Sequence, residues 1–322
     1  MNHSRDGDLM ADADWSEQLE ITPCPLCGSG THDQLFVARD RLVGLPGEFP
    51  VVRCRDCRFV FLNPRPTEDA LPNWYPDVYY PVGGGAETPE AIAVARGLLS
   101  RVEAIQPGQS QSILDVGCGT GLFLKFARDA GHQVQGVELS QSAVNYGRNV
   151  YGLPIETGSV ESVALPESSF DVITMWHVLE HLPDSVATLG RIARLLKPGG
   201  VLLFGVPNIA SLEAKLFGRR WFSLDAPRHV GHFSPETARR AVESAGLAIE
   251  RIDHSPGTAG LVYSLMGDLT GVSLKLRGRQ FRDSSYHRLA GLIGVPARVV
   301  CAVAARFGRG GAIEVFARKT AL

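Results

Sequence analysis

Residues Ile113-Leu114-Asp115-Val116-Gly117-Cys118-Gly119-Thr120-Gly121 decide the fold of this chain. An apolar run ends in an acidic residue and enters a turn with glycine at every second position. The next residues, Gly121 to Ala127, carry apolar side chains at the spacing of an amphipathic helix. A strand, a glycine turn and a helix in this order place backbone N–H groups at the carboxyl end of the strand. The segment therefore predicts a cofactor site, and with it an enzyme.

Two carboxylates near this turn indicate which cofactor it binds. A nicotinamide-binding turn has glycine where this chain has Leu122, and Asp115 just before the glycines would repel a pyrophosphate. The predicted next strand, Gln133 to Glu138, ends in an acid roughly 20 residues after the glycines, where a carboxylate can accept both hydroxyls of a ribose. A ribose without a pyrophosphate favours S-adenosylmethionine.

At these residues the chain resembles the class I methyltransferases. Their first motif is similar to Leu114–Gly121, and their second-strand acid corresponds to Glu138. The resemblance continues through Phe170 to Trp176, similar to the fourth strand of the family, and Leu196 to Phe204, similar to the fifth. It implies an α/β, Rossmann-like fold with a seven-stranded sheet, S-adenosylmethionine as the cofactor, and methyl transfer as the activity.

The same resemblance implies which residues contact S-adenosylmethionine. The segment Gly158–Glu161 falls where the family has a loop against the adenine, usually with Asp at the position of Ser159. A hydroxyl accepts more weakly than a carboxylate, so the Val160 amide is the safer adenine contact. The expected cofactor-binding residues are Asp115, Gly117, Cys118, Gly119, Gly121, Glu138, Leu139, Ser159, Val160 and Trp176.

Length and charge limit the domain organisation and the partners. The 322 residues predict one large core and a smaller module, with the methyltransferase domain over 86–322. The net charge is −2 with both signs interspersed, so no electrostatic footprint for nucleic acid stands out. Residues 1–20 are polar and acidic without an apolar core, which predicts a disordered tail, no secretion signal and a cytoplasmic protein.

Four of the six cysteines form two C-x-x-C pairs, and these pairs predict a metal site. Two such pairs supply four thiolates for one tetrahedral ion, which leaves no open position for chemistry. We expect a structural zinc within a zinc-ribbon-like module and aromatic strap over 21–85. An iron site of similar spacing is the alternative, and disulfides are disfavoured in a cytoplasmic chain. The four predicted ligands are Cys24, Cys27, Cys54 and Cys57.

The segment His177-Val178-Leu179-Glu180-His181 matches a short zinc-protease motif, but it directly follows a predicted core strand. This position resembles that of an acid-x-x-acid-His metal cluster in quinone-type O-methyltransferases. Here the first acid is replaced by His177, which removes a hard oxygen ligand for magnesium. We expect Glu180 and His181 to brace the local helix, and His177 is a candidate substrate contact.

The loop from Trp221 to Pro235 supplies the other candidate catalytic residues. It leads to a helix with Ser234 as the N-cap, and loops at this edge of the sheet cover the acceptor. Its second half resembles the Glu-His segment of zinc-binding sugar C-methyltransferases, where the His is the general base. The Glu position is Arg228 here. The resemblance and the loop position favour His229 as the base, with His177 and His232 behind it.

Residues 255–311 form an insertion before the last predicted strand, Ala312 to Lys319. Within it, 289–305 is apolar but short of the ~20 residues a membrane span needs, and it contains Pro296 and Arg298. One interpretation is two short helices that wall the substrate pocket. The other is peripheral contact of 272–306 with the inner face of a membrane, which would reach a lipid-linked acceptor.

These observations predict methyl transfer to an O, N or C atom of a small-molecule or glycan-like acceptor. The main alternative enzyme is an RNA base methyltransferase, since some of these also carry an amino-terminal zinc module. The non-enzyme alternative is a scaffold that only binds the cofactor. The intact set of Asp115, glycines and Glu138 argues for binding but not by itself for turnover.

Overall fold

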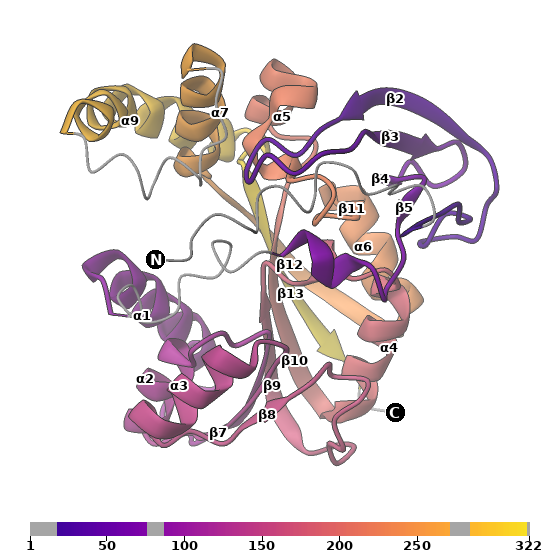
Figure 1. Cartoon of the computed structure of the whole chain (residues 1–322). Helices are drawn as coiled ribbons and strands as arrows, with labels where there is room; N and C mark the ends of the chain where they lie inside the picture. The colour runs from indigo at the N-terminus through magenta and orange to yellow at the C-terminus, as the bar shows by residue number, and fades with distance from the viewer. Residues whose placement is uncertain (1–17, 76–86, 271–283, 321–322) are drawn as a thin grey trace, which may run out of the picture.

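The computed structural model describes residues 18–75, 87–270 and 284–320. Figure 1 shows a large sheet with helices on both of its faces and a smaller sheet above one of its edges. The last part of the predicted module and strap, 76–85, and the first part of the 272–306 segment, 272–283, lie outside the described residues.

The large sheet has seven strands in the order β12-β13-β10-β9-β6-β7-β8. Strands β6 to β10 run parallel, whereas β13 is antiparallel to both of its neighbours. This is the predicted Rossmann-like methyltransferase fold. The strands are β6 Ser112–Val116, β7 Gln133–Glu138, β8 Ile155–Thr157, β9 Phe170–Trp176, β10 Leu196–Pro207, β12 Leu247–Ser255 and β13 Ala312–Lys319.

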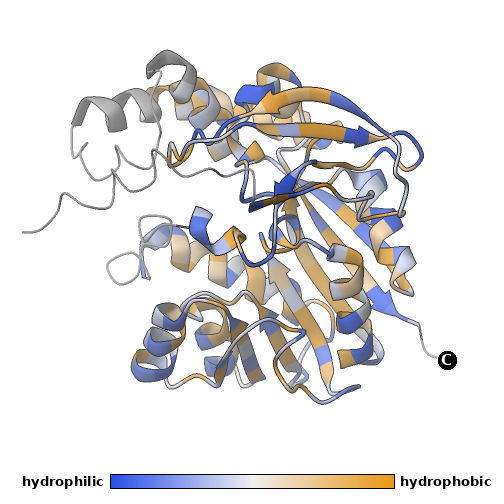
Figure 2. Ribbon diagram, turned by 45° about the vertical axis from the view of Figure 1, so that its right-hand side comes forward, coloured by the Kyte–Doolittle hydropathy of each residue, from blue (hydrophilic) through white to orange (hydrophobic). Residues whose placement is uncertain are grey.

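Helices cover both faces of this sheet (Figure 1). All of them except α2, which begins after Gly121, have a side-chain N-cap. At the start of α6, for example, Ser234 and Thr237 form a reciprocal capping box, with Pro235 as the first helical residue. The central strands are the most hydrophobic part of the chain (Figure 2), because both of their faces are buried. The helices are α1 Pro89–Glu103, α2 Leu122–Asp129 and α3 Gln141–Tyr151 on one face, and α4 Ser185–Leu195 and α6 Pro235–Ser244 on the other.

The smaller sheet combines the amino-terminal module with a piece of the methyltransferase domain. Strands β2 His32–Ala38, β3 Phe49–Cys54 and β4 Val60–Leu62 are joined by β11 Gly231–His232, and β11 pairs with β4. Phe59 of the module packs on Phe233 with ring centroids 5.0 Å apart. The module therefore shares a core with the methyltransferase domain.

The chain before this module is ordered at its end. Leu19–Glu20 forms β1, which pairs with β5 Arg65–Pro66. The predicted disordered tail over 1–20 was therefore wrong at these two residues, because the backbone groups of β5 offer them hydrogen-bond partners. A short 3-10 helix, η2 Leu71–Trp74, follows β5.

The insertion contains two helices, α7 Thr258–Thr270 and α9 Ser284–Arg306. The apolar stretch 289–305 lies within α9 alone, so the interpretation of this stretch as two short helices was wrong. Pro296 lies inside this helix, where its ring removes one backbone hydrogen bond and crowds the carbonyl of residue 292. Among the described helices, none has the combination of length and hydropathy that crossing a bilayer requires.

Candidate active site

A cavity of about 1230 Å³ lies along the carboxyl edge of the parallel strands. Its floor is formed by the ends of β6, β7 and β9, and its other walls come from η2, from the loop before β11 and from the start of α7. Gly117, Glu138, Leu139, Ser159 and Val160 line one end, and His177, His181, Glu213, Asp225 and His229 line the rest. The cavity therefore joins the predicted cofactor residues to two of the three predicted catalytic histidines.

The glycine turn has the backbone shape that the sequence predicted. Gly117 and Gly121 have φ values of +70° and +82°, in the left-handed region that favours glycine. A Cβ at Gly117 would lie 2.4 Å from Val178 Cγ2, and a Cβ at Gly121 would lie 2.6 Å from Leu153 Cδ1. Any larger residue would have to displace its neighbour, so the turn depends on glycine for space as well as for conformation.

Glu138 is positioned by two backbone amides. Gly119 N–H donates to Oε2 at 2.9 Å and Ser140 N–H donates to Oε1 at 2.8 Å. A carboxylate oxygen can accept more than one hydrogen bond, so both oxygens retain capacity for a ribose hydroxyl. Leu139, which is 70% exposed, presents an apolar surface on the same cavity wall. These residues fit an adenosine.

Asp115 lies under the turn rather than on the cavity wall. Thr174 Oγ1 donates to Asp115 Oδ1 at 2.7 Å. Burial raises the pKa of Asp115 to about 7, and the nearby charge of Glu138 adds to the shift while the hydrogen bond from Thr174 opposes it.

Four further predicted cofactor residues also lie outside the cavity lining. Cys118, Gly119 and Gly121 belong to the turn itself. The Trp176 indole packs over Gly205, where a Cβ would lie 2.6 Å from Cε3, and joins the core on the side of α1, α2 and α3. These residues shape the backbone that faces the cavity.

Glu180 connects His177 to the interior. His177 follows β9 with a φ of +55°, and its Nδ1 lies 3.1 Å from Glu180 Oε1. Desolvation opposes the charged form of His177, although its side chain is 59% exposed, and the hydrogen bond and the charge of Glu180 outweigh this effect and raise the pKa of His177. Burial likewise opposes ionisation of Glu180, yet His177 and the neighbouring His229 and His181 lower the pKa of Glu180 to about 2. Glu180 is thus a buried carboxylate surrounded by histidines.

His181 and His229 pack against each other with ring centroids 4.5 Å apart. His181 Nδ1 lies 3.1 Å from the Arg228 carbonyl and 2.8 Å from the Tyr75 hydroxyl. Burial, followed by the charge of His229, lowers the pKa of His181 to about 4, so His181 is neutral near pH 7.

His229 has a defined tautomer. Its Nδ1 donates to the Ser223 carbonyl, at 2.9 Å, so Nε2 carries the lone pair in the neutral ring. Asp225 Oδ2 lies 3.8 Å from Nε2. In the neutral ring, Nε2 of this cavity-wall histidine can accept a proton, and the carboxylates of Asp225 and Glu180 can stabilise the resulting cation.

His232, the third candidate base, lies in β11 and is 3% exposed. It does not line the cavity, and burial together with the charge of His229 lowers its pKa to about 3.

Arg228, at the position of the Glu in sugar C-methyltransferases, is completely buried. It donates to Asp225 Oδ1 at 2.7 Å and to Asp40 Oδ1 at 2.6 Å. Asp40 belongs to the amino-terminal module and also accepts the backbone amides of Leu42 and Val43. Arg228 therefore holds the loop from Trp221 to Pro235 to the amino-terminal module. No local sequence pattern predicted this contact.

Glu213 is a cavity residue that sequence reasoning missed. It lies in α5 Leu212–Phe217 and is 3% exposed. Trp221 Nε1 donates to Oε1 at 3.0 Å, while Oε2 has no hydrogen-bond partner among the described residues. Burial raises the pKa of Glu213 to about 7, against the opposing hydrogen bond from Trp221. An acid in the first turn of a short helix is common, so the sequence held no signal for this role.

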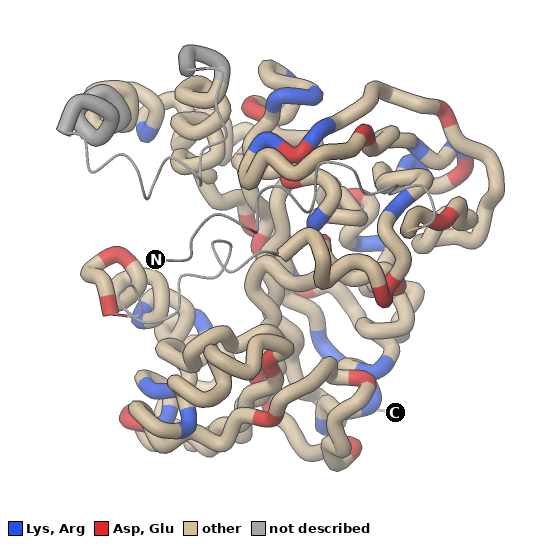
Figure 3. The backbone as a smooth tube through the Cα atoms, viewed as in Figure 1, with Lys and Arg blue, Asp and Glu red and all other residues tan. Residues whose placement is uncertain are grey.

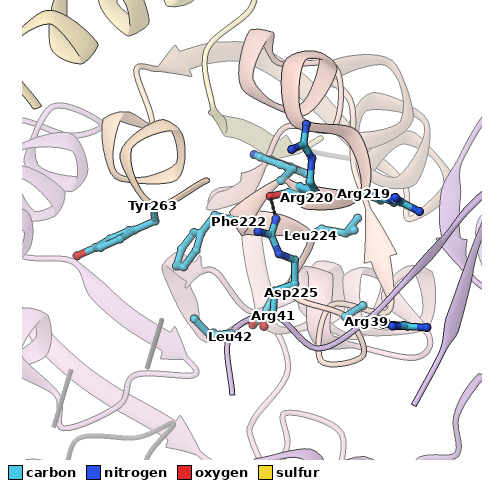
Figure 4. Close-up of a pocket in the computed structure, with 11 residues that line it drawn as sticks. Arg39, Arg41, Leu42, Arg219, Arg220, Phe222, Leu224, Asp225 and Tyr263 are labelled. Atoms are coloured by element: carbon cyan, nitrogen blue, oxygen red, sulfur yellow. Dashed lines mark hydrogen bonds between the residues drawn. The ribbon is translucent and has the colours of Figure 1, made fainter. Parts of the chain in front are cut away.

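A small hollow adjoins the cavity at the boundary with the module (Figure 4). The two share Leu42, Phe222 and Asp225. Phe222 packs on Tyr263 of α7 with ring centroids 5.0 Å apart, and Arg41 donates to the Arg220 carbonyl beside them. The hollow thus extends the apolar wall of the cavity towards a surface with several arginines.

The four predicted metal ligands lie together at one end of the small sheet. The Sγ atoms of Cys24 and Cys57 are 3.5 Å apart, as are those of Cys27 and Cys54, and no pair forms a disulfide. All four lie within 4.8 Å of one another. Tetrahedral thiolates about 2.3 Å from an ion have this kind of separation, so the residues fit a four-thiolate metal.

A second group, Glu180, His181 and His229, also brings its ligand atoms within 4.8 Å of one another. Two neutral imidazoles and a carboxylate can hold a divalent ion. The same atoms can instead serve proton transfer, with His229 as the base.

Comparisons with known proteins agree with this fold and site. The family model described as "Methyltransferase domain" matches residues 90–252. Malonyl-[acyl-carrier protein] O-methyltransferase of Serratia marcescens is 32% identical over 191 residues, covering 58% of this chain and 72% of the relative. Ubiquinone biosynthesis O-methyltransferase of Thiobacillus denitrificans is 30% identical over 182 residues, covering 52% and 78%.

A solved structure shows the same fold at lower identity. A putative sarcosine dimethylglycine methyltransferase from Galdieria sulphuraria superposes with a TM-score of 0.51 at 17% identity, covering 71% of this chain and 86% of that one. The chain belongs to the class I S-adenosylmethionine-dependent methyltransferases. It is therefore an enzyme, which removes the scaffold alternative.

Proposed function

We propose that this methyltransferase acts on a hydroxylated small-molecule or glycan-like acceptor and that His229 is its general base. S-adenosylmethionine supplies an already activated methyl group. The protein must then orient the acceptor, remove its proton and exclude water. The observation that carries the proposal is the position of His229 in the wall of the shared cavity, where Nδ1 donates to the Ser223 carbonyl and Nε2 holds the lone pair of the neutral ring.

The chain's own residues divide this work. Glu138 holds the ribose hydroxyls at one end of the cavity. His229 Nε2 takes the acceptor proton, and the carboxylates of Asp225 and Glu180 stabilise the imidazolium. Glu213 Oε2 accepts a hydrogen bond from a second donor of the acceptor, which would satisfy an atom that has no partner among the described residues.

The acceptor class can be tested by the release of S-adenosylhomocysteine. A panel would contain nucleotide sugars, glycans, phenols and carrier-bound acyl groups, with a crude RNA fraction as the comparison. Turnover on a hydroxylated small molecule or glycan is the expected result. Salt-sensitive turnover on RNA alone would contradict the proposal and support the RNA alternative.

We further propose that Cys24, Cys27, Cys54 and Cys57 bind one structural zinc ion. The positions of the four Sγ atoms support this, and such ions couple to folding. Elemental analysis of the purified chain should find about one equivalent of zinc, and Cys54→Ser should lose it. One equivalent of iron would identify the rubredoxin-like alternative instead. A folded module with neither metal would refute the site.

A further inference from the structure

Helix α9 has two different faces. One face packs on α7 through small residues, with Ala297 and Cys301 buried and Ala297 in a cluster with Val262 and Met266. On the opposite face, and at Phe307 just after the helix, the large apolar side chains are 45–77% exposed. These side chains are Leu292, Val295, Val299, Val300, Val303 and Phe307.

These exposed residues form a stripe. Leu292, Val295, Val299 and Val303 are spaced by three, four and four positions, so they follow one line along the helix. Of the 12 large apolar residues that are exposed in the described part of the chain, six belong to this surface. The others are scattered over separate elements, as is normal for a protein surface. A concentrated apolar stripe of this kind marks an interaction site.

Charge indicates what covers the stripe. Residues 269–311 contain eight Lys and Arg against one Asp, a net +7 in a chain whose total is −2. Over residues 291–306 of α9 the charged residues are all basic, and Figure 3 shows no acidic position there. These residues are Arg298 and Arg306. A second copy of the chain would set arginines against arginines, whereas an anionic lipid surface would pair with them.

We propose that α9 docks on the surface of an anionic membrane. The Leu292–Val303 stripe enters the boundary between headgroups and acyl chains, and Arg298 and Arg306 contact the headgroups. Because α7 both packs on α9 and lines the cavity at Ala259 and Gly260, the acceptor cavity lies one helix away from the bilayer. This surface is separate from the catalytic groups, so the docking does not depend on the acceptor or the base.

The test is flotation of the full chain with lipid vesicles. One set would be pure phosphatidylcholine and the other would include about 30% phosphatidylglycerol. The wild-type chain should float with the anionic vesicles and dissociate as salt rises. Val299→Glu/Val303→Glu should lower its partition coefficient at least about 10-fold, because two charges would enter the apolar boundary.

The matched control is Val94→Glu/Val150→Glu, which places the same charges on exposed valines of α1 and α3. It should bind vesicles as the wild type does. Unchanged S-adenosylmethionine affinity would show that both double variants are folded. Wild-type binding to neither vesicle, or equal binding of both double variants, would overturn the proposal. So would a dimer in sedimentation velocity that Val299→Glu/Val303→Glu dissociates without any vesicle binding, because a second copy would then cover the stripe.

Discussion

The two ends of the cavity are built in different ways. The cofactor end comes from consecutive turns, 117–121, 138–140 and 158–160, and is shaped largely by backbone amides and glycines. The acceptor end combines side chains from the end of β9, the loop before β11, α5 and η2. The cofactor is constant across the family, so a backbone cradle suffices, while the acceptor end varies through its loops. The cofactor end is therefore encoded by short local segments, and the acceptor end by contacts between residues that are distant in sequence.

The largest effect is expected for a substitution that destabilises the acceptor end. Arg228→Met removes the cation between Asp40 and Asp225, so two buried carboxylates lose the guanidinium that compensates their charge. The free energy of unfolding should fall by about 3–5 kcal/mol, measured by denaturant titration. Arg239→Met, at an exposed pair with Glu243, is the control and should cost less than about 0.5 kcal/mol. Equal effects of the two variants would show that Arg228 does not hold the loop to the module.

The next prediction concerns the cofactor end. Glu138→Ala should weaken S-adenosylmethionine binding by about 2–4 kcal/mol, because two charge-assisted hydrogen bonds to the ribose are lost. Isothermal titration calorimetry measures the change. The control, Glu156→Ala, removes an exposed carboxylate of β8 outside the cavity lining. Unchanged affinity in Glu138→Ala would remove the ribose assignment.

A third prediction is that a substitution at the acceptor end lowers turnover without changing cofactor affinity. His229→Asn keeps a polar side chain but removes the base, so kcat should fall about 10²-fold or more while cofactor affinity stays nearly constant. His254→Asn, in β12 and outside the cavity lining, should stay close to wild type. If His229→Asn is folded and turns over within a few-fold of the parent, the assignment moves to His177.

The smallest effect is a pH dependence at Glu213. Its folded pKa of about 7 lies above the usual value for a carboxyl, so the folded state holds the proton more tightly than the unfolded state. Stability from this group is therefore present below the usual pKa and is lost as pH rises towards about 7. Glu213→Gln should remove about 1–3 kcal/mol of this decline between roughly pH 4.5 and 8. A variant and wild type with parallel stability profiles would contradict the raised pKa.

Much of the acceptor end could not be predicted for one physical reason. Glu213, Tyr75 and Asp40 have unremarkable local sequences, and their roles arise only from groups far along the chain. Glu213 is unusual because it is buried beside Trp221 with one oxygen lacking a described partner. Burial of a polar atom is a tertiary property that neighbouring residues do not specify.

The sequence by itself determined the class of this protein. The glycine spacing, Asp115 and Glu138 specify a strand, a turn and a carboxylate whose geometry depends on residues close together, so local chemistry was enough. The two C-x-x-C pairs predicted their own proximity because four thiolates with this spacing fit one tetrahedral ion. Only the tertiary structure decided that β11 completes the module's sheet, that Arg228 lies between Asp40 and Asp225, and that one face of α9 stays exposed. Each of these depends on which distant surfaces meet, because burial and pairing across the fold are set by packing rather than by local pattern.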